Sequence, residues 1–169
     1  MSIIANDRSC GDCTACCDGW LKAEINGKKI HPGIGCEHAD RGCGIYETRP
    51  VSPCRNFKCQ WLLDPNMPEW MKPSRSKVIL KGKQIWERPS ADVPAIVASS
   101  VGPKIPGKTK NWLLSYAEQT GEVILCIEPV REKKKYTLEQ RKYAIGDPGY
   151  VDEVRQCVEE DREILIRSA

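Results

Sequence analysis

Long hydrophobic runs are absent from this sequence of 169 residues. None of its windows approaches the roughly 18 consecutive apolar residues that a membrane-spanning helix needs. Met1 to Arg8 also lack the apolar core of a secretory signal peptide. We therefore expect a protein that does not enter the membrane and that lies in the cytoplasm, where thiols stay reduced.

Histidines and common catalytic motifs are scarce. His31 and His38 are the only histidines, and neither a G-x-S-x-G motif nor a dinucleotide-binding glycine pattern occurs. One string, Gly102 to Thr109, matches the P-loop pattern G-x-x-x-x-G-K-[ST]. Its two prolines remove N–H donors from the phosphate cradle, so we interpret it as a basic loop before a helix, with Thr109 as N-cap and room for an anion. Whether the protein is an enzyme stays open.

Acidic residues are few in the middle of the chain. Residues 72–142 carry 15 basic and 7 acidic side chains, whereas the flanking regions carry net charges of −1 and −4. Such an excess is usually a solvated surface. It also allows an anionic partner to bind this region and leaves nucleic acid as a less favoured partner.

Cysteine, in contrast, is abundant. Eight of the ten cysteines lie in the first 59 residues, and they begin with two successive C-x-x-C spacings followed by an adjacent pair. A C-x-x-C turn directs two thiolates at one point, which suits a metal ion. A disulfide framework is disfavoured in a reducing compartment. We therefore predict a metal-binding protein with eight ligands: Cys10, Cys13, Cys16, Cys17, Cys36, Cys43, Cys54 and Cys59.

The adjacent pair bears on the kind of metal centre. Neighbouring residues rarely direct both side chains at one ion, so Cys16 and Cys17 are expected to serve different ions or to bridge a polynuclear centre. The first three cysteines match the start of the iron–sulfur pattern C-x2-C-x2-C-x3-C-P, but the fourth position fails. The remaining spacings favour Zn2+, with iron or an iron–sulfur cluster as the alternative. His38, or less favourably His31, is a candidate ligand in place of a thiolate.

The same residues resemble a known family. The features that carry the resemblance are the cysteines of the run from Cys10 to Cys59 and the segment Ile45-Tyr46-x2-Arg49-Pro50. This pattern is similar to the CxxCxxCC family of YkgJ-type cysteine-cluster proteins and covers about the first third of the chain. The resemblance implies chelation of zinc or iron, with a cellular role that is mostly unassigned. In relatives that attach the cluster to a flagellin lysine methylase, an iron–sulfur centre is implied.

The pattern of residues predicts an α+β protein. We expect a loop-rich, metal-bound cysteine region over residues 1–69 and, packed against it, a small antiparallel sheet with one or two helices over residues 70–169. Asn26-Gly27 predicts the turn of a β-hairpin, and Gly82 predicts another within residues 77–88.

Further along, residues 93–98 are expected to form a strand or a short helix, residues 111–120 a helix ended by Gly121, and residues 122–127 a buried strand. A last helix is predicted over residues 148–167, with Cys157 alongside its apolar face. Cys126, inside the buried strand, is expected to be a small core residue.

Several side chains near the cysteines are candidates for supporting roles. Tyr46, Phe57 and Trp61 are expected to pack beside the metal and to exclude water. Arg49 and Arg55 either balance the charge of the centre or hold an anionic substrate, or else they form ion pairs with nearby Glu47 or Asp40. The favoured function is metal binding. The alternatives are an iron–sulfur enzyme or electron-transfer protein and a zinc-dependent nucleic-acid-binding module.

Overall fold

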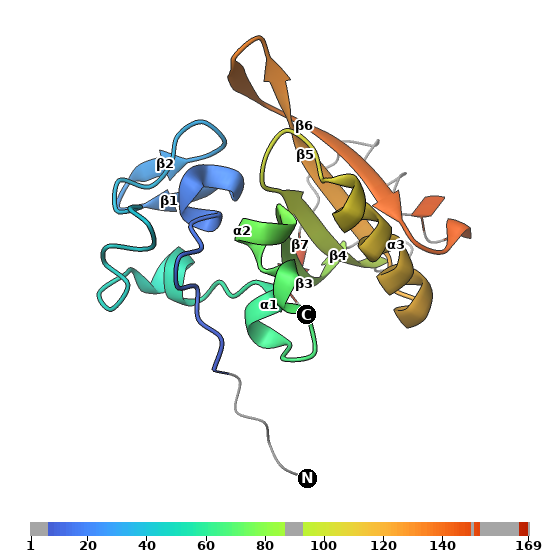
Figure 1. The fold of residues 1–169 in the computed structure, drawn as a ribbon. Coiled ribbons are helices and arrows are strands. Elements are labelled where there is room, and N and C mark those ends of the chain that lie inside the picture. The colour runs from blue at the N-terminus through green and yellow to red at the C-terminus, as the bar shows by residue number, and fades with distance from the viewer. Residues whose placement is uncertain (1–6, 87–92, 150, 153–165, 169) are drawn as a thin grey trace.

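The computed structural model describes residues 7–86, 93–149, 151–152 and 166–168. Two parts lie side by side in Figure 1: a loop-rich part that contains the N-terminal cysteines, and a twisted sheet with a long helix across it. Helices and strands follow one another without a regular βα repeat. The predicted α+β class is confirmed.

The cysteine part has little regular structure. It contains a π-helical turn η1 (Cys16–Trp20), a hairpin of β1 (Ala23–Ile25) and β2 (Lys28–Ile30), and a second π-helical turn η2 (Val51–Arg55). In the hairpin Ile25 pairs with Lys28, and Asn26 and Gly27 have positive φ angles of 51° and 77°. Both central residues of a type I′ turn require such angles, which Asn-Gly adopts readily. The hairpin predicted from Asn26-Gly27 is confirmed.

Three short helical segments connect the two parts: α1 (Gln60–Leu63), η3 (Glu69–Met71) and α2 (Pro73–Ser76). The sheet follows, with strands in the order β6-β5-β4-β3-β7. Its strands are β3 (Val78–Trp86), β4 (Val93–Ser100), β5 (Ile124–Glu132), β6 (Lys135–Ile145) and β7 (Ile166–Ser168).

The sheet is mixed, where the sequence predicted an antiparallel one. Strands β4 and β5 run parallel, with Ala98 opposite Cys126, and the other neighbours are antiparallel. Parallel neighbours need a crossover connection. Here α3 (Gly107–Thr120) provides it.

Two local predictions in this part need correction. The hairpin at Gly82 is wrong: β3 continues through Gly82, and the pairing with β4 only shifts register between Leu80 and Lys83. Such a shift marks a bulge, the other common use of glycine inside a strand. Thr109 is not the N-cap, because α3 begins at Gly107 after Pro106 and the Thr109 hydroxyl donates a 2.6 Å hydrogen bond to the Ser76 carbonyl.

Other predictions agree with the structure or fall outside it. Residues 93–98 are part of a strand, and α3 ends at Gly121, whose φ is 70°. Most of the helix predicted over residues 148–167, including Cys157, lies outside the described residues. Its last two positions, Ile166 and Arg167, belong to β7, which pairs with β3.

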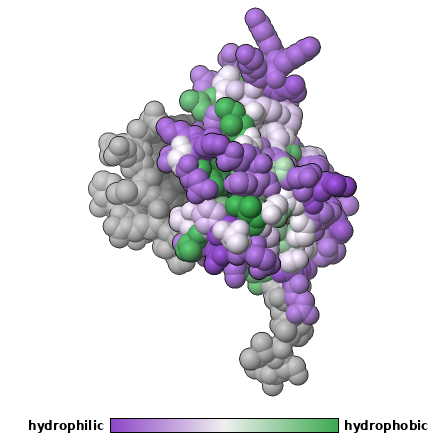
Figure 2. Space-filling view, turned by 90° about the vertical axis from the view of Figure 1, so that its left-hand side faces the viewer, coloured by the Kyte–Doolittle hydropathy of each residue, from purple (hydrophilic) through white to green (hydrophobic). Residues whose placement is uncertain are grey.

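One hydrophobic cluster extends through both parts of the molecule. Ala15, Cys59 and Trp61 from the cysteine part pack in it together with sheet residues such as Ile79 and Cys126. Cys126 is fully buried, as predicted for a core residue. The cysteine part is therefore packed against the sheet. In the face shown in Figure 2, hydrophobic residues form small patches among hydrophilic ones. Within the described residues, no helix has the length and apolar character needed to cross a membrane.

Candidate metal centre: a cavity lined by thiols

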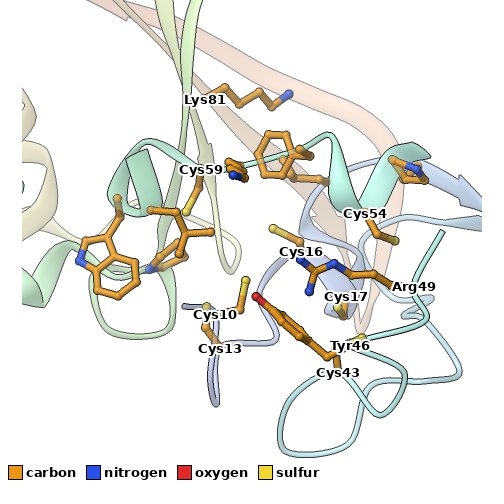
Figure 3. Close-up of a pocket in the computed structure, with 18 of the residues that line it drawn as sticks. Cys10, Cys13, Cys16, Cys17, Cys43, Tyr46, Arg49, Cys54, Cys59 and Lys81 are labelled. Carbon is orange, nitrogen blue, oxygen red and sulfur yellow. The ribbon is translucent and has the colours of Figure 1, made fainter. Parts of the chain in front are cut away.

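Seven of the eight predicted ligands surround one cavity of about 650 Å³ in the cysteine part (Figure 3). They are Cys10, Cys13, Cys16, Cys17, Cys43, Cys54 and Cys59. The eighth, Cys36, does not line the cavity, but its backbone N–H donates a 2.6 Å hydrogen bond to the carbonyl oxygen of Cys17. All nine cysteines in the described part of the chain are free thiols. The fold thus gathers cysteines that lie up to 49 positions apart in the sequence.

The first cysteine loop is shaped by a tight turn and by one glycine. The N–H of Cys13 donates to the carbonyl of Cys10 at 2.9 Å, which closes the first C-x-x-C turn. Further on, Gly19 has a φ of 86°, and a Cβ on it would overlap the backbone carbonyl of His31. Only glycine allows the chain after Cys17 to come this close to the loop that carries Cys36.

A second loop holds Cys36 and Cys43. The N–H of Ala39 donates to the Cys36 carbonyl at 3.1 Å, and Ala39 forms an isolated antiparallel bridge with Cys43. The N–H of Gly44 closes the loop with a 2.8 Å bond to the His38 carbonyl. These bonds keep the two cysteines near each other without any helix or strand.

Basic side chains surround the thiols. Six of them line the cavity, and none of its described lining residues is acidic; the six are Arg8, Lys22, Arg49, Lys58, Lys72 and Lys81. Lys72 is only 8% exposed, and its Nζ lies 2.6 Å from the carboxylate of Asp12. Burial lowers the pKa of Lys81, and the nearby thiol of Cys16 opposes this shift. The positive charges favour thiolates, so the surroundings suit an anionic centre.

Lys72 and Lys81 were not predicted as part of the site. No motif marks them, because they lie beyond the cysteine region, before and within the strand β3. The signal that points to Lys81 is its position directly after the buried residues Val78, Ile79 and Leu80. Charged residues are rarely found next to a buried stretch of a strand unless they have a partner there, so this position points to a role for Lys81.

The thiols raise one another's pKa. Burial raises the pKa of Cys17 to about 12, with smaller contributions from Cys43, Cys36 and Cys54. Burial also raises the pKa of Cys16, with Cys59 and Cys13 as the strongest neighbouring thiols. A set of buried thiols cannot ionise together unless positive charge compensates them. A metal centre supplies that compensation, and binding then releases protons.

Two residues that line the cavity have a buried donor without a partner in the described structure. Arg49 Nε and Trp61 Nε1 make no hydrogen bond within the described structure, and both residues line the cavity. The guanidinium of Arg49 lies 3.6 Å from the centroid of the Tyr46 ring. Buried donors are rarely left unpaired in proteins. Sulfur atoms of a metal centre in this cavity are acceptors that these two N–H groups fit.

The spacing of the thiols bears on the kind of centre. Among the described residues, no group of three or more Cys, His, Asp or Glu side chains is placed to hold a single metal ion. In a tetrahedral zinc site, bonds of about 2.3 Å place the sulfurs roughly 3.8 Å apart. Here the thiols are distributed around a wide cavity. This donor set fits a larger centre in which different thiolates bind different metal atoms.

The remaining predicted residues fall into two groups, those that line the cavity and those that do not. Tyr46, Phe57 and Trp61 all line the cavity, as does Arg49. His31 Nδ1 lies 3.1 Å from the Pro32 carbonyl and His38 Nε2 lies 3.9 Å from the Glu37 carboxylate, and neither residue lines the cavity.

Arg55 donates a 2.7 Å hydrogen bond to the backbone carbonyl of Glu47 and not to its carboxylate. The carboxylate of Asp40 forms an ion pair with Arg41 instead, whose Nε lies 3.8 Å from it.

The P-loop-like string lies between a strand and a helix, as a P-loop does. It connects β4 with α3, and β5 returns parallel to β4. However, the backbone N–H of Ile105, inside this string, donates a 2.9 Å hydrogen bond to the carboxylate of Glu128, a residue that is 3% exposed. The carboxylate of Glu128 therefore already accepts the hydrogen bond from a backbone N–H that a bound phosphate would need. Lys108 lies over the ring of Trp70, 4.4 Å from its centroid.

Comparisons with protein-family models, with curated proteins and with solved structures found no match to this chain. The resemblance to the CxxCxxCC family therefore stays a prediction, and the site is interpreted from its own residues.

Proposed function

We propose that this protein binds a polynuclear iron–sulfur centre through its clustered cysteines and acts in electron transfer or redox chemistry. The observation that carries the proposal is the arrangement of the thiols. Seven of them surround one cavity, yet no three ligand side chains of the described residues are placed around a single ion. In a [4Fe–4S] cluster each of the four thiolates binds a different iron atom, so the thiolates stay apart from one another.

The surrounding residues support such a centre. Arg49 and Trp61 have buried N–H groups that can donate to its sulfur atoms, and hydrogen bonds to sulfur help to set a reduction potential. The ammonium of Lys81 and the guanidinium of Arg49 offset the negative charge of the thiolates. Phe57 and Trp61 provide apolar walls that limit water. When bound, an iron–sulfur centre supplies reversible one-electron transfer.

Zinc is the second candidate, because several of the cysteine spacings in the sequence match no iron–sulfur pattern. A zinc site would require the thiols to draw together. It would stabilise the cysteine part by on the order of 10 kcal/mol, and its role would be structural. With either metal we place the protein in a reducing compartment such as the cytoplasm, since free thiols persist there. Nucleic-acid binding has the support only of the charge distribution and of the zinc-like cysteines.

The test is elemental and sulfide analysis, with a visible spectrum, on protein purified without oxygen. Iron with matching inorganic sulfide and a brown absorbance is the expected result. Two zinc ions per chain and no colour would replace the iron–sulfur proposal by the zinc one. Protein that binds neither metal after anaerobic reconstitution would overturn metal binding altogether. Cys126→Ser is the matched control, because this thiol lies in the core and outside the cavity.

A further inference from the structure

The eight thiols are not evenly distributed, and the adjacent pair marks the division. Cys59 is 5% exposed and belongs to the hydrophobic cluster that extends into the sheet. Cys13 and Cys16 pack against this same cluster. Cys10 is held to Cys13 by the 2.9 Å backbone bond of their turn. Three thiols thus pack with the core that extends into the sheet, and the turn keeps Cys10 with them.

Of the other four thiols, three line the cavity and the fourth, Cys36, is bonded through its backbone to one of them. Cys17, Cys36, Cys43 and Cys54 are absent from the set that packs against the core cluster; Cys10 is absent from it too, but the turn holds Cys10 to Cys13. Cys17 is connected to Cys36 by a 2.6 Å backbone hydrogen bond, and the loop bonds at Ala39 bring Cys43 to Cys36. In Figure 3, Cys17, Cys43 and Cys54 lie on one side of Cys16, whereas Cys10, Cys13 and Cys59 lie on its other side.

We infer that the cysteines form two four-thiolate sites, one made of Cys10, Cys13, Cys16 and Cys59 and the other of Cys17, Cys36, Cys43 and Cys54. The inference rests on the proposed metal binding and specifies which thiols share a centre. The sites are interleaved along the chain, because Cys59 closes the first site after all the ligands of the second. The Cys16–Cys17 peptide joins them, so the two centres are close neighbours.

The test is to identify, by alkylation and mass spectrometry, which thiols each substitution exposes in the metal-loaded full chain. Cys16→Ser is expected to make Cys10, Cys13 and Cys59 reactive and to leave the other four protected, with about half of the metal lost. Cys17→Ser is expected to expose Cys36, Cys43 and Cys54 instead. Cys126→Ser should leave all eight protected.

A variant that unfolds would expose every thiol, so the wild-type protein is also treated with a chelator and sampled over time. Deprotection in two sets of four, with the membership given above, is the expected result. Simultaneous release of all eight thiols, or sets of different membership, would overturn the two-site assignment while metal binding itself stands. A wild-type chain that holds no metal after reconstitution would instead overturn the proposed function.

Discussion

The guanidinium of Arg8 lies 4.7 Å from the centroid of the Trp61 ring and donates a 2.8 Å hydrogen bond to the Trp61 carbonyl. The same side chain donates to the carbonyl oxygens of Asp64 at 2.7 Å and Met67 at 2.6 Å. One residue at the start of the described chain therefore fixes the turn after α1. The helix α1 itself follows Cys59 and carries Trp61, whose side chain lines the thiol cavity.

Arg8→Ala is expected to lower the free energy of unfolding by about 2 kcal/mol, because several carbonyl oxygens lose a charged donor. Chemical denaturation of the metal-free and metal-loaded protein measures this. Arg75→Ala is the control: its ion pair with Glu69 is exposed on both sides and should contribute less than about 1 kcal/mol. Equal effects of the two substitutions would contradict the role assigned to Arg8.

Gly19 and Gly27 provide a matched pair, since both have positive φ angles, 86° and 77°. At Gly27 an added Cβ meets nothing within 4 Å, so Gly27→Ala should cost only about 1 kcal/mol of backbone strain. At Gly19 the Cβ would overlap the His31 carbonyl, and the loop would have to move. We expect Gly19→Ala to lower metal content as well as stability, measured by elemental analysis and denaturation. Full metal content in Gly19→Ala would show that this close approach is not needed.

Local chemistry explains which parts of the fold were predictable. The Asn26-Gly27 turn, the end of α3 at Gly121 and the burial of Cys126 depend on neighbouring residues, and the sequence predicts them. The parallel pairing of β4 with β5 depends on how α3 packs, which no local pattern encodes. Gly82 shows the same limit, because a turn and a bulge both favour glycine.

The site shows a similar division. Spacing alone identified the cysteines, and the structure brings seven of them to one cavity. The spacing could not show that Cys59 lies with Cys16 on the core side, because that proximity comes from the hydrophobic cluster shared with the sheet. Nor could the spacing of the cysteines place Lys72 and Lys81 at the cavity, since both lysines come from outside the cysteine region.

From the ion pair between Asp12 and Lys72 we predict that the fold loses stability at low pH. The hydrogen bond and charge of Lys72 lower the pKa of Asp12 below its usual value. The pair therefore stabilises the fold above the unfolded-state pKa, about 3.9, and this contribution is lost as the pH falls through the lower folded-state pKa. Asp12→Asn should be less stable than wild type near pH 7, and the difference should shrink below about pH 4.

Urea denaturation across this pH range measures that difference. Glu37→Gln is the control, because Glu37 and its partner Lys28 are both exposed, at 51% and 66%, whereas Lys72 is 8% exposed. Substitution at Asp12 leaves a buried ammonium without its carboxylate and should therefore have the larger effect. A pH-independent difference between wild type and Asp12→Asn would contradict the assignment.

Glu128 predicts how the P-loop-like string behaves. Its carboxylate accepts hydrogen bonds from the Ile105 N–H at 2.9 Å and the Tyr143 hydroxyl at 3.0 Å. Glu128→Ala removes the acceptor of both donors and should lower the free energy of unfolding by about 2–6 kcal/mol, since each unsatisfied buried group costs about 1–3 kcal/mol. Tyr143→Phe removes only one of the two bonds and should cost less.

Because the carboxylate already accepts a donor of the loop, the wild-type protein should not bind a nucleoside triphosphate there. Titration calorimetry with Mg-ATP is expected to show no heat of binding in wild type. Lys108→Ala is a useful comparison, since a P-loop lysine would contact the phosphates, whereas here Lys108 lies over Trp70. Binding of Mg-ATP that Lys108→Ala abolishes would mean that Glu128 yields its place to phosphate, and the string would then be a nucleotide site after all.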